Sequence, residues 1–323
     1  MGKIIVGVLR GGPSSEHDVS LKTGASVLAA LPEKYLARDV FISKDNHWHL
    51  DRKPTTADRV FNSVDVIFNA LHGQYGEDGK VQMLMDAHGV PYTGSGAVAS
   101  ALGMSKTLAR EAFKKAGLKI ARAVIGDMKE ETPESFAAKI FKTMPPPWVI
   151  KPAAAGSSVG VSVVRILNEL AEAVRQAAQF DSKILAEEYI PGREATCGVL
   201  DGFRGQKHYA LPVIEVAPPA KNKFFDYEAK YGGGTREICP AHFDLPTKRK
   251  LEQLAVLAHN AVGARHYSRS DFIVSKKGIY ILEINTLPGL TGESLVPKAV
   301  EAVGSSQTEL IDHLLKLALS SDL

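Results

Sequence analysis

Residues 3–16, KIIVGVLRGGPSSE, decide how this chain begins to fold. The apolar residues 4–9 predict a buried strand, and Gly11-Gly12-Pro13 predicts the turn that ends it. A helical pattern follows and stops before Pro32, and a second mostly buried strand is expected at 64–68. Strand, glycine turn, helix and strand in this order predict a parallel α/β domain.

After residue 95 the pattern of elements changes. A helix at 104–117, strands at 148–150 and 161–164 and a helix at 168–179 predict a small α+β domain. Beyond it strands dominate around a helix at 248–262, and they are expected at 184–190, 195–200, 208–215, 270–275 and 279–284. A capping box, Ser306 to Glu309, predicts the start of the last helix.

The expected fold class is therefore α/β and α+β, with domains at residues 1–95, 96–186 and 187–323. Residues 218–237 contain several lysines and three consecutive glycines but little periodicity. A long polar loop of this kind in a compact domain often serves as a mobile lid. We therefore expect a lid within the C-terminal domain.

Composition excludes several classes of protein. The 323 residues carry a net charge of only +3, with no long basic run, which gives no reason to expect nucleic acid or an anionic membrane as a partner. Cys197 and Cys239 have no CxxC neighbour, so two reduced, partly buried thiols are expected. The apolar start is too short for a signal peptide or a membrane span, and a cytoplasmic protein is expected.

Acidic and amide side chains gather near the C-terminus, in Arg269-x-Asp271 and Glu283-x-Asn285. Each pair lies on an expected strand, so alternate residues share one face. If the two strands are adjacent, Asp271, Glu283 and Asn285 meet there, with Arg269 beside them. Such hard oxygen ligands suit Mg²⁺, especially when phosphates supply the remaining ligands. A surface salt-bridge cluster is the alternative.

A lysine precedes a glycine-rich loop in the middle of the chain. Lys151 ends the apolar strand, and residues 156–160, GSSVG, can offer backbone N–H groups to phosphate oxygens. The loop is not a Walker A motif, because no GK[ST] follows, and a plain glycine hairpin remains an alternative. Lys106 and Lys230 indicate nothing by themselves.

Two N-terminal residues occupy places where α/β proteins bind ligands. Glu16, near a helix start, could bind an ammonium group or merely favour the helix dipole. His72 follows the second strand and could equally be an ordinary loop residue. The dinucleotide pattern GxGxxG is absent, which argues against a nicotinamide-dependent dehydrogenase.

Eight stretches together give a specific resemblance over nearly the whole chain. The chain resembles D-alanine–D-alanine ligases of the ATP-grasp superfamily in these stretches: GGPSSEHDVS (11–20), LHGQYGEDGKVQ (71–82), PYTGSGAVASALGMSK (91–106), VIKPAAAGSSVGVS (149–162), EEYIPGREATCGV (187–199), FDYEAKY (225–231), RSDF (269–272) and EINTLPGLTGESLVPK (283–298). Any one of them would be weak, but their shared order is specific. The resemblance implies a three-domain ATP-grasp architecture with an N-terminal parallel α/β domain.

The resemblance also implies how ATP and metal bind. ATP would lie between the central and C-terminal domains, with Lys106 and Lys151 at the α- and β-phosphates and Lys230 at the γ-phosphate. Ser158 would also bind the cofactor. Glu187 would meet the adenine amino group, and Glu194 the ribose. Tyr189 and Ile190 would add backbone contacts. Two Mg²⁺ (or Mn²⁺) ions would be held by Asp271, Glu283 and Asn285.

The implied reaction joins two D-alanines through D-alanyl phosphate and supplies peptidoglycan precursors. Arg269 and a backbone N–H near Gly289 would stabilise the tetrahedral centre. Ser294 and the N–H of Leu295 would hold the second carboxylate. The implied catalytic and substrate-binding residues are Glu16, His72, Ser157, Tyr231, Arg269, Gly289, Ser294 and Leu295, with Glu16, Ser157 and Tyr231 linked by hydrogen bonds.

Alternatives to this function remain at the level of sequence. The same mechanism could use D-lactate or D-serine as the second substrate, or the scaffold could be a non-catalytic ATP-binding regulator. The retained Lys151, Arg269, Asp271 and Glu283 argue against the regulator. A homodimer is an expectation from the family alone.

Overall fold

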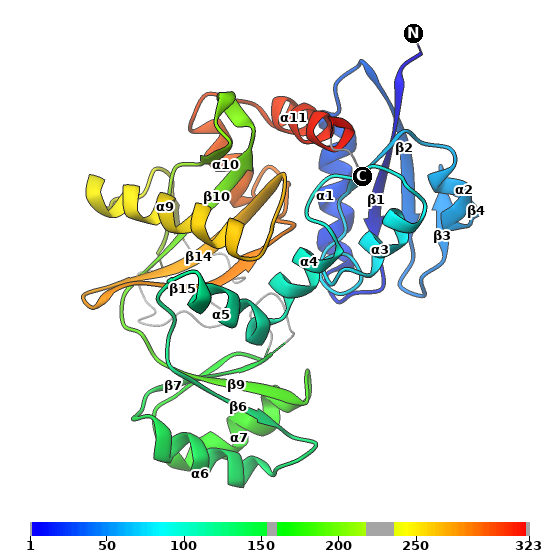
Figure 1. Ribbon diagram of the computed structural model, residues 1–323. Helices are drawn as coiled ribbons and strands as arrows, with labels where there is room; N and C mark the ends of the chain where they lie inside the picture. The colour runs from blue at the N-terminus through cyan, green and yellow to red at the C-terminus, as the bar shows by residue number, and fades with distance from the viewer. Residues whose placement is uncertain (1, 154–159, 218–235, 321–323) are drawn as a thin grey trace.

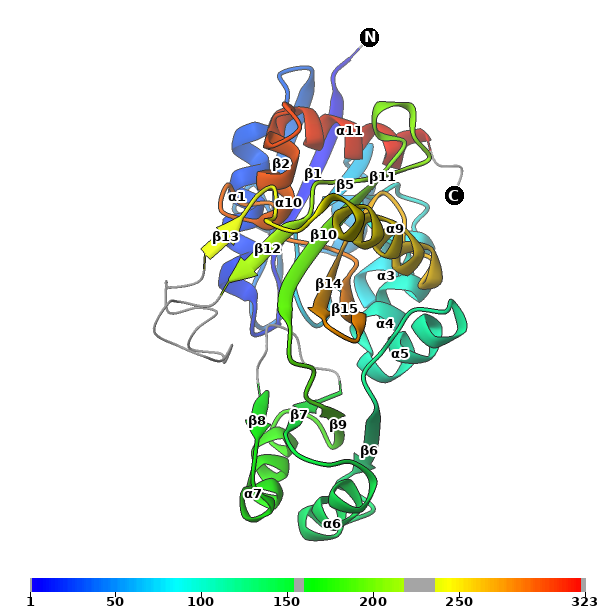
Figure 2. The same ribbon diagram turned by 90° about the vertical axis from the view of Figure 1, so that its left-hand side faces the viewer.

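The computed structural model describes residues 2–153, 160–217 and 236–320. In this part of the chain the strands form three separate sheets of five, four and six strands. Figures 1 and 2 show the four-stranded sheet and its two helices as a small lobe that extends away from the rest of the molecule. The fold is mixed α/β, with parallel strands in the N-terminal sheet, as the sequence predicts.

The N-terminal sheet has the strand order β4-β3-β2-β1-β5. Strands β2, β1 and β5 are parallel, whereas β3 and β4 form an antiparallel edge that the sequence did not reveal. The elements of this region are β1 (Ile4–Gly11), α1 (His17–Ala30), β2 (Tyr35–Ile42), β3 (Trp48–Leu50), β4 (Lys53–Thr55), α2 (Ala57–Phe61), β5 (Val66–Asn69) and α3 (Lys80–Ala87).

Glycine is required at the turn that follows β1. Gly11 has a φ of +92°, and a Cβ there would lie 2.2 Å from the carbonyl oxygen of Ile42. A side chain would therefore clash with the neighbouring strand as well as strain the backbone. The turn carries Ser14 and Glu16 across the carboxyl edge of the sheet, where ligands bind in parallel α/β folds.

The small lobe is an antiparallel sheet in the order β6-β9-β7-β8, packed against two helices. Trp148 is fully buried in its core together with Phe136 and Leu170. Its elements are β6 (Ala123–Asp127), α6 (Pro133–Thr143), β7 (Trp148–Pro152), β8 (Ser162–Val164), α7 (Leu167–Ala178) and β9 (Lys183–Glu188).

The C-terminal sheet is antiparallel, with β10 between β12 and β14, and with β15 next to β14. Its elements are β10 (Arg193–Asp201), the 3₁₀ helix η1 (Phe203–Gly205), β11 (His208–Ala210), β12 (Ile214–Ala217), β13 (Arg236–Ile238), α9 (Leu245–Ala261), β14 (Tyr267–Ser275), β15 (Gly278–Asn285), α10 (Leu295–Glu301) and α11 (Gln307–Ser320). The predicted capping box of α11 is present: Ser306 N–H donates to Glu309, and Glu309 N–H donates to Ser306 Oγ.

Helices α4 (Ala97–Met104) and α5 (Lys106–Lys115) connect the regions of the chain. Both contact β15, and α5 also contacts α9 (Figure 1). Ala109 and Phe113 of α5 belong to the same buried cluster as Phe272 of β14 and Leu251 of α9. Lys106, at the first position of α5, is thereby fixed beside the C-terminal sheet.

Three expectations about individual elements were wrong. The strand expected at 208–215 is divided into β11 and β12, because Pro212 has no N–H to donate to the ladder. The helix expected at 104–117 begins at Lys106, since Ser105 is extended and accepts a hydrogen bond from Leu108 N–H as the cap. The end of the expected loop at 218–237 belongs to β13, which pairs with β12.

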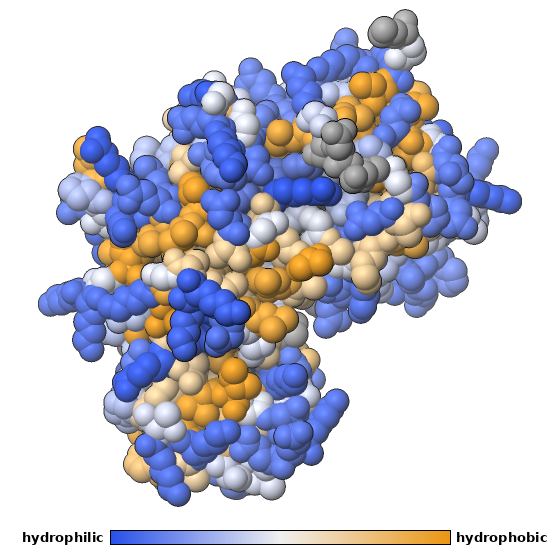
Figure 3. Space-filling model, in the orientation of Figure 1, coloured by the Kyte–Doolittle hydropathy of each residue, from blue (hydrophilic) through white to orange (hydrophobic). Residues whose placement is uncertain are grey.

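Both cysteines are free thiols, Cys197 buried and Cys239 partly buried, as expected. Among the described residues, no helix is both long and apolar enough to cross a membrane. Figure 3 shows apolar side chains gathered on the face of the molecule that carries α4 and α5, where Val98 and Leu108 are exposed.

Candidate active site

Strands β14 and β15 bring the predicted acidic residues together. In the register, Asp271 lies opposite Glu283 and Arg269 lies opposite Asn285. Residues two apart on a strand face the same side, so all four side chains share one face. A register shift directly after Asp271 bends the ladder at this point. Asp271 is only 6% exposed, and its Oδ1 accepts from Thr196 Oγ1 at 2.6 Å.

Arg269 is held by the acidic residues around it. Its Nε and Nη2 donate to the two carboxylate oxygens of Asp271 at 3.1 and 3.2 Å. Burial opposes the charge of Arg269, but Asp271, Glu283 and Glu77 outweigh it and raise the pKa of the guanidinium above its usual value. Arg269 thus remains a fixed cation between the C-terminal sheet and the N-terminal loop that contains Glu77.

Two lysines stand beside this acidic face. Lys106 Nζ lies 3.6 Å from Glu283 Oε2, and Lys106 N–H donates to Ala153 O, two residues beyond Lys151. Burial is the largest influence on Lys106 and lowers its pKa; the charge of Glu283 opposes this shift, and that of Lys151 adds to it. Two desolvated ammonium groups that repel each other form a site suited to a polyanion.

Glu187 of β9 lies between two cations. Its Oε2 is 2.6 Å from Lys151 Nζ, and its Oε1 accepts from the guanidinium of Arg110 on α5. Glu187 is 5% exposed. A buried carboxylate needs such partners, because an unpaired charge would be strongly destabilising.

The N-terminal loops supply a second group of polar side chains. Potential ligand atoms of Glu16, His72 and Glu77 lie within 4.8 Å of one another. His72 is buried, and its Nε2 is 2.8 Å from Thr23 Oγ1 while its Nδ1 is 3.5 Å from Glu77. Ser14 Oγ donates to His72 O and accepts from Glu16 N–H, which ties the two loops together.

The loop after β15 meets this N-terminal group. Ser294 Oγ accepts from Thr291 N–H at 3.1 Å, and Leu295 is the first residue of α10. A Cβ placed on Gly289 would lie 3.1 Å from Ser294 Oγ and 3.9 Å from His72 Nε2. Gly289, Ser294 and His72 therefore surround one point, although they come from opposite ends of the chain.

The remaining predicted residues lie nearer the central lobe or outside the described residues. Tyr189 N–H donates to Pro147 O, so this N–H is already engaged within the protein. Tyr189 and Ile190 are partly buried after β9. Glu194 is two residues from Thr196 on β10 and shares its face with the Thr196–Asp271 pair. Ser157, Ser158, Lys230 and Tyr231 lie outside the described residues.

Sequence reasoning missed three residues that the structure brings into this region. Arg110 binds Glu187, Thr196 binds Asp271, and Glu77 contacts His72. Arg110 follows Lys106 by four positions on α5, a spacing that places both on one helix face. Thr196 and Glu77 fall inside two of the quoted stretches, but nothing in their local pattern marks them as site residues.

Curated relatives resemble the chain over nearly its full length. A D-alanine–D-alanine ligase from Syntrophobacter fumaroxidans is 41% identical over 98% of this chain and 98% of its own. One from Halalkalibacterium halodurans is 41% identical over 97% of this chain and 99% of its own. Among solved structures, a D-Ala:D-Ser ligase from Enterococcus faecalis has a TM-score of 0.87 at 27% identity, covering 98% of this chain and 99% of that one.

The D-alanine–D-alanine ligase from Coxiella burnetii is 24% identical in sequence and has the same fold, with a TM-score of 0.84 over 99% of this chain and 94% of that one. The small antiparallel lobe and the larger sheet beside it, with an α/β region in front, define the ATP-grasp class of enzymes. Family models described as "D-ala D-ala ligase N-terminus" match residues 5–62 and 49–95, and "D-ala D-ala ligase C-terminus" matches 112–316. The chain belongs to the D-alanine–D-alanine ligase family.

Proposed function

We propose that this protein joins two D-alanine molecules in an ATP-dependent reaction that passes through D-alanyl phosphate. Curated relatives at 41% identity over almost the entire chain carry the name of this activity. One observation carries the proposal: Lys106 forms an ion pair with Glu283, and Glu283 lies opposite Asp271 on the neighbouring strand. Groups suited to phosphate and groups suited to a divalent ion thus lie side by side.

ATP would bind along the seam between the small lobe and the C-terminal sheet. Lys106 and Lys151 are placed to hold the phosphates, and their mutual repulsion would be relieved by a polyanion. Glu187, Tyr189, Ile190 and Glu194 would meet the nucleoside, and we assign Ser158 and Lys230 to the phosphate tail. Binding of ATP would compete for the ion pair between Lys151 and Glu187.

The acidic face fits Mg²⁺ by the chemistry of its donors. Asp271, Glu283 and Asn285 offer only hard oxygen ligands, and Asp271 is buried and already ordered by Thr196 and Arg269. Asn285 Oδ1 accepts from Leu287 N–H at 2.8 Å, which fixes the direction of its amide. When bound, Mg²⁺ would neutralise phosphate charge and align the transfer.

The substrates would bind where the N-terminal loops meet the loop after β15. Glu16 would bind the ammonium of the first D-alanine, within the group that contains His72. Ser294 and Leu295 N–H would hold the second carboxylate. Arg269 and Gly289 N–H would stabilise the oxyanion that forms when the second amine attacks the acyl phosphate. We also propose that hydrogen bonds link Glu16, Ser157 and Tyr231.

A free carboxylate is a poor acyl donor, because oxide is a poor leaving group. Phosphorylation of the first D-alanine supplies phosphate as a better one, and the intermediate must be protected from water. The product would supply peptidoglycan precursors, and the use of ATP supports a cytoplasmic location. We further propose domains at 1–95, 96–186 and 187–323 and a homodimeric assembly.

The decisive experiment measures ADP release with ATP, Mg²⁺ and candidate amino acids. We expect turnover with D-alanine and none with L-alanine. Adding D-serine or D-lactate together with D-alanine tests the alternative second substrates. The Enterococcus faecalis ligase is named for one of them, D-serine. A mixed product formed in preference to the D-alanine dipeptide would contradict the proposal.

The metal assignment has its own test in Glu283→Gln. This change keeps the shape of the side chain, which is partly exposed, but removes its charge. We expect turnover to disappear while the circular dichroism melt stays close to that of the wild type. Unchanged turnover would rule out Glu283 as a metal ligand, and no ADP release from any amino acid in the wild type would favour the regulator.

A further inference from the structure

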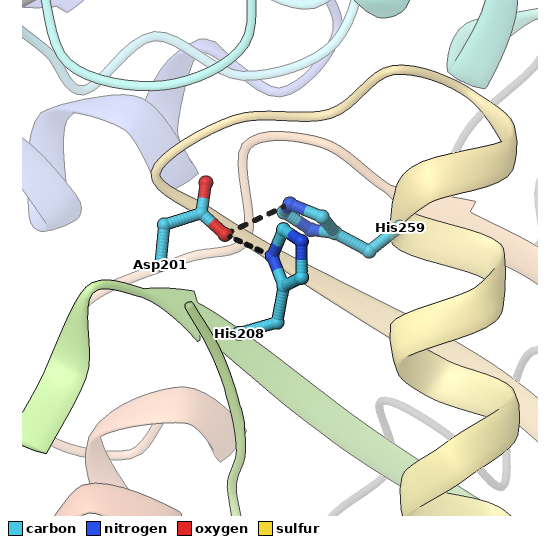
Figure 4. Close-up of side chains that lie close together, drawn as sticks. All are labelled: Asp201, His208 and His259. Atoms are coloured by element: carbon cyan, nitrogen blue, oxygen red, sulfur yellow. Dashed lines mark hydrogen bonds and ion pairs between the residues drawn. The ribbon is translucent and has the colours of Figure 1, made fainter. Parts of the chain in front are cut away.

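Asp201, His208 and His259 form a compact cluster apart from the ligase site (Figure 4). Asp201 ends β10, His208 begins β11 and His259 lies near the end of α9. Asp201 Oδ1 is 2.7 Å from His208 Nδ1 and 3.2 Å from His259 Nε2. One carboxylate oxygen and two imidazole nitrogens therefore point at a common centre.

The environment of His259 leaves one of its nitrogens without a satisfactory partner. His259 is 0% exposed, and Ser268 Oγ lies 2.8 Å from its Nδ1. Its Nε2 forms an ion pair with Asp201 Oδ1 at 3.2 Å, but the two atoms lie outside regular hydrogen-bond geometry. A buried polar atom of this kind is costly unless something else satisfies it.

The distances from Asp201 Oδ1 to the two imidazole nitrogens can be compared with those around a metal ion. Tetrahedral Zn²⁺ with bonds of about 2.0–2.1 Å holds its ligand atoms about 3.3 Å apart. The Asp201–His259 distance already has this value within 0.1 Å, and His208 would move by about 0.6 Å. His208 lines a neighbouring cavity, which leaves room for such a shift.

The partners around the cluster also match those of metal ligands. Ser268 next to Nδ1 of His259 fixes the ring orientation, as outer hydrogen-bond partners of metal-bound histidines do. Asp201 Oδ2 accepts from His266 N–H at 2.6 Å, which leaves Oδ1 for the centre of the cluster. His208 lines a cavity of about 660 Å³ next to α9, through which an ion and a water ligand could enter.

Two other uses of the cluster fit less well. Ser268, His259 and Asp201 follow one another like a hydrolytic triad, but Ser268 is 1% exposed and cannot meet a substrate. A purely structural hydrogen-bond network would be expected to align His259 Nε2 with Asp201, whereas the two form an ion pair at 3.2 Å outside regular hydrogen-bond geometry.

We propose that Asp201, His208 and His259 bind one divalent transition-metal ion, of which Zn²⁺ is the best match, with water as the fourth ligand. Two imidazoles and a carboxylate favour Zn²⁺ over Mg²⁺, because Mg²⁺ prefers ligands that are all oxygen atoms. The ion would join the β10–β11 hairpin to α9 and so stabilise the C-terminal sheet. The proposal does not depend on the ligase reaction.

The test uses the full-length protein, freed of metal with a chelator and kept in millimolar Mg²⁺. We expect one Zn²⁺ per chain by calorimetry and a higher melting temperature with Zn²⁺. X-ray absorption at the zinc edge should count two imidazole ligands. The rival group Glu16, His72 and Glu77 contains one histidine, so a count of one would place the ion there and overturn the proposal.

Variants then locate the ion. His208→Gln should weaken Zn²⁺ binding by about 100-fold, and Ser268→Ala by about 10-fold through loss of the ring partner. The matched control is His47→Gln, which removes an exposed imidazole on the N-terminal region and should leave Zn²⁺ affinity unchanged. No uptake at micromolar Zn²⁺, or equal affinity in His208→Gln and His47→Gln, would overturn the proposal. The absorption measurement needs no variant, so it decides even if a variant folds poorly.

Discussion

Replacement of Glu187 by glutamine tests the charge balance at the seam between the small lobe and the C-terminal sheet, where we propose that ATP binds. Glu187, Lys151 and Arg110 have side chains only 6%, 9% and 11% exposed. Neutralising Glu187 would leave two cations in a poorly hydrated place. Breaking a buried pair in this way costs about 3–5 kcal/mol, and because glutamine keeps one acceptor we expect a loss of about 3 kcal/mol in the free energy of unfolding.

Glu188→Gln is the matched control, since it makes the same change one residue further along β9. Glu188 pairs with Arg122 at 3.1 Å, and the Arg122 side chain is 62% exposed. An exposed pair contributes less than about 1 kcal/mol. The two variants should therefore differ by about 2 kcal/mol or more.

Urea unfolding followed by the fluorescence of Trp148 measures this difference. Trp148 is fully buried in the same sheet and lies opposite Glu188 in the register. A Trp48→Phe background removes the other tryptophan, which is in the N-terminal sheet. Equal losses in the two variants would refute the reasoning. Adding Lys151→Met to Glu187→Gln should restore part of the stability, because one unpaired cation is then gone.

Three further predictions concern other parts of the molecule. The KM for ATP should begin to rise at an alkaline pH that is still below 10.5, the usual pKa of lysine, because the pKa of Lys106 is lowered and its ammonium loses its proton early. Lys106→Arg should flatten this pH profile, because arginine keeps its charge. A rise that persists in this variant would contradict the assignment of Lys106 to ATP binding. Gly289→Ala should lower kcat/KM for D-alanine about tenfold with little change in melting temperature, since the new Cβ would lie 3.1 Å from Ser294 Oγ and displace it. If the variant has the kinetics of the wild type, the substrates bind elsewhere. Burial opposes the ionisation of Asp312, but bonds from Lys316, Lys34 and Tyr35 outweigh it and lower its pKa to about 2. Its stabilising effect is therefore present above about pH 4 and is lost as the pH falls through about 2, so Asp312→Asn should be less stable than the wild type at pH 6 by about 1 kcal/mol. The gap should close only below pH 2, and a gap that persists at about pH 1 in acid titration would refute the charge argument.

The main elements could be predicted because their causes are local. The apolar run after Lys3, the glycines that follow it and the capping box before α11 each fix a short piece of backbone without help from the rest of the chain. Alternation on two strands was enough to place Asp271 and Glu283 on one face, once the strands were assumed to be neighbours. The family could likewise be inferred from ordered motifs.

Other features depend on contacts between distant residues. The pairing of β10 with β14 is one such feature, because Thr196 and Asp271 are 75 positions apart. The edge strands β3 and β4 were missed for another reason, since each spans only three residues and is too short to show alternation. Arg110 binds Glu187 because α5 packs against β15, which brings the Arg110 guanidinium to the Glu187 carboxylate.

The sequence by itself determined the class of fold, and it placed Arg269, Asp271, Glu283 and Asn285 on one face of two neighbouring strands. Only the tertiary structure decided which side chains meet: His72 with Thr23 and Glu77, and Asp201 with His208 and His259. The physical reason is that backbone propensity and hydrophobic period act over a few residues, whereas burial and charge pairing depend on which segments the folded core brings together.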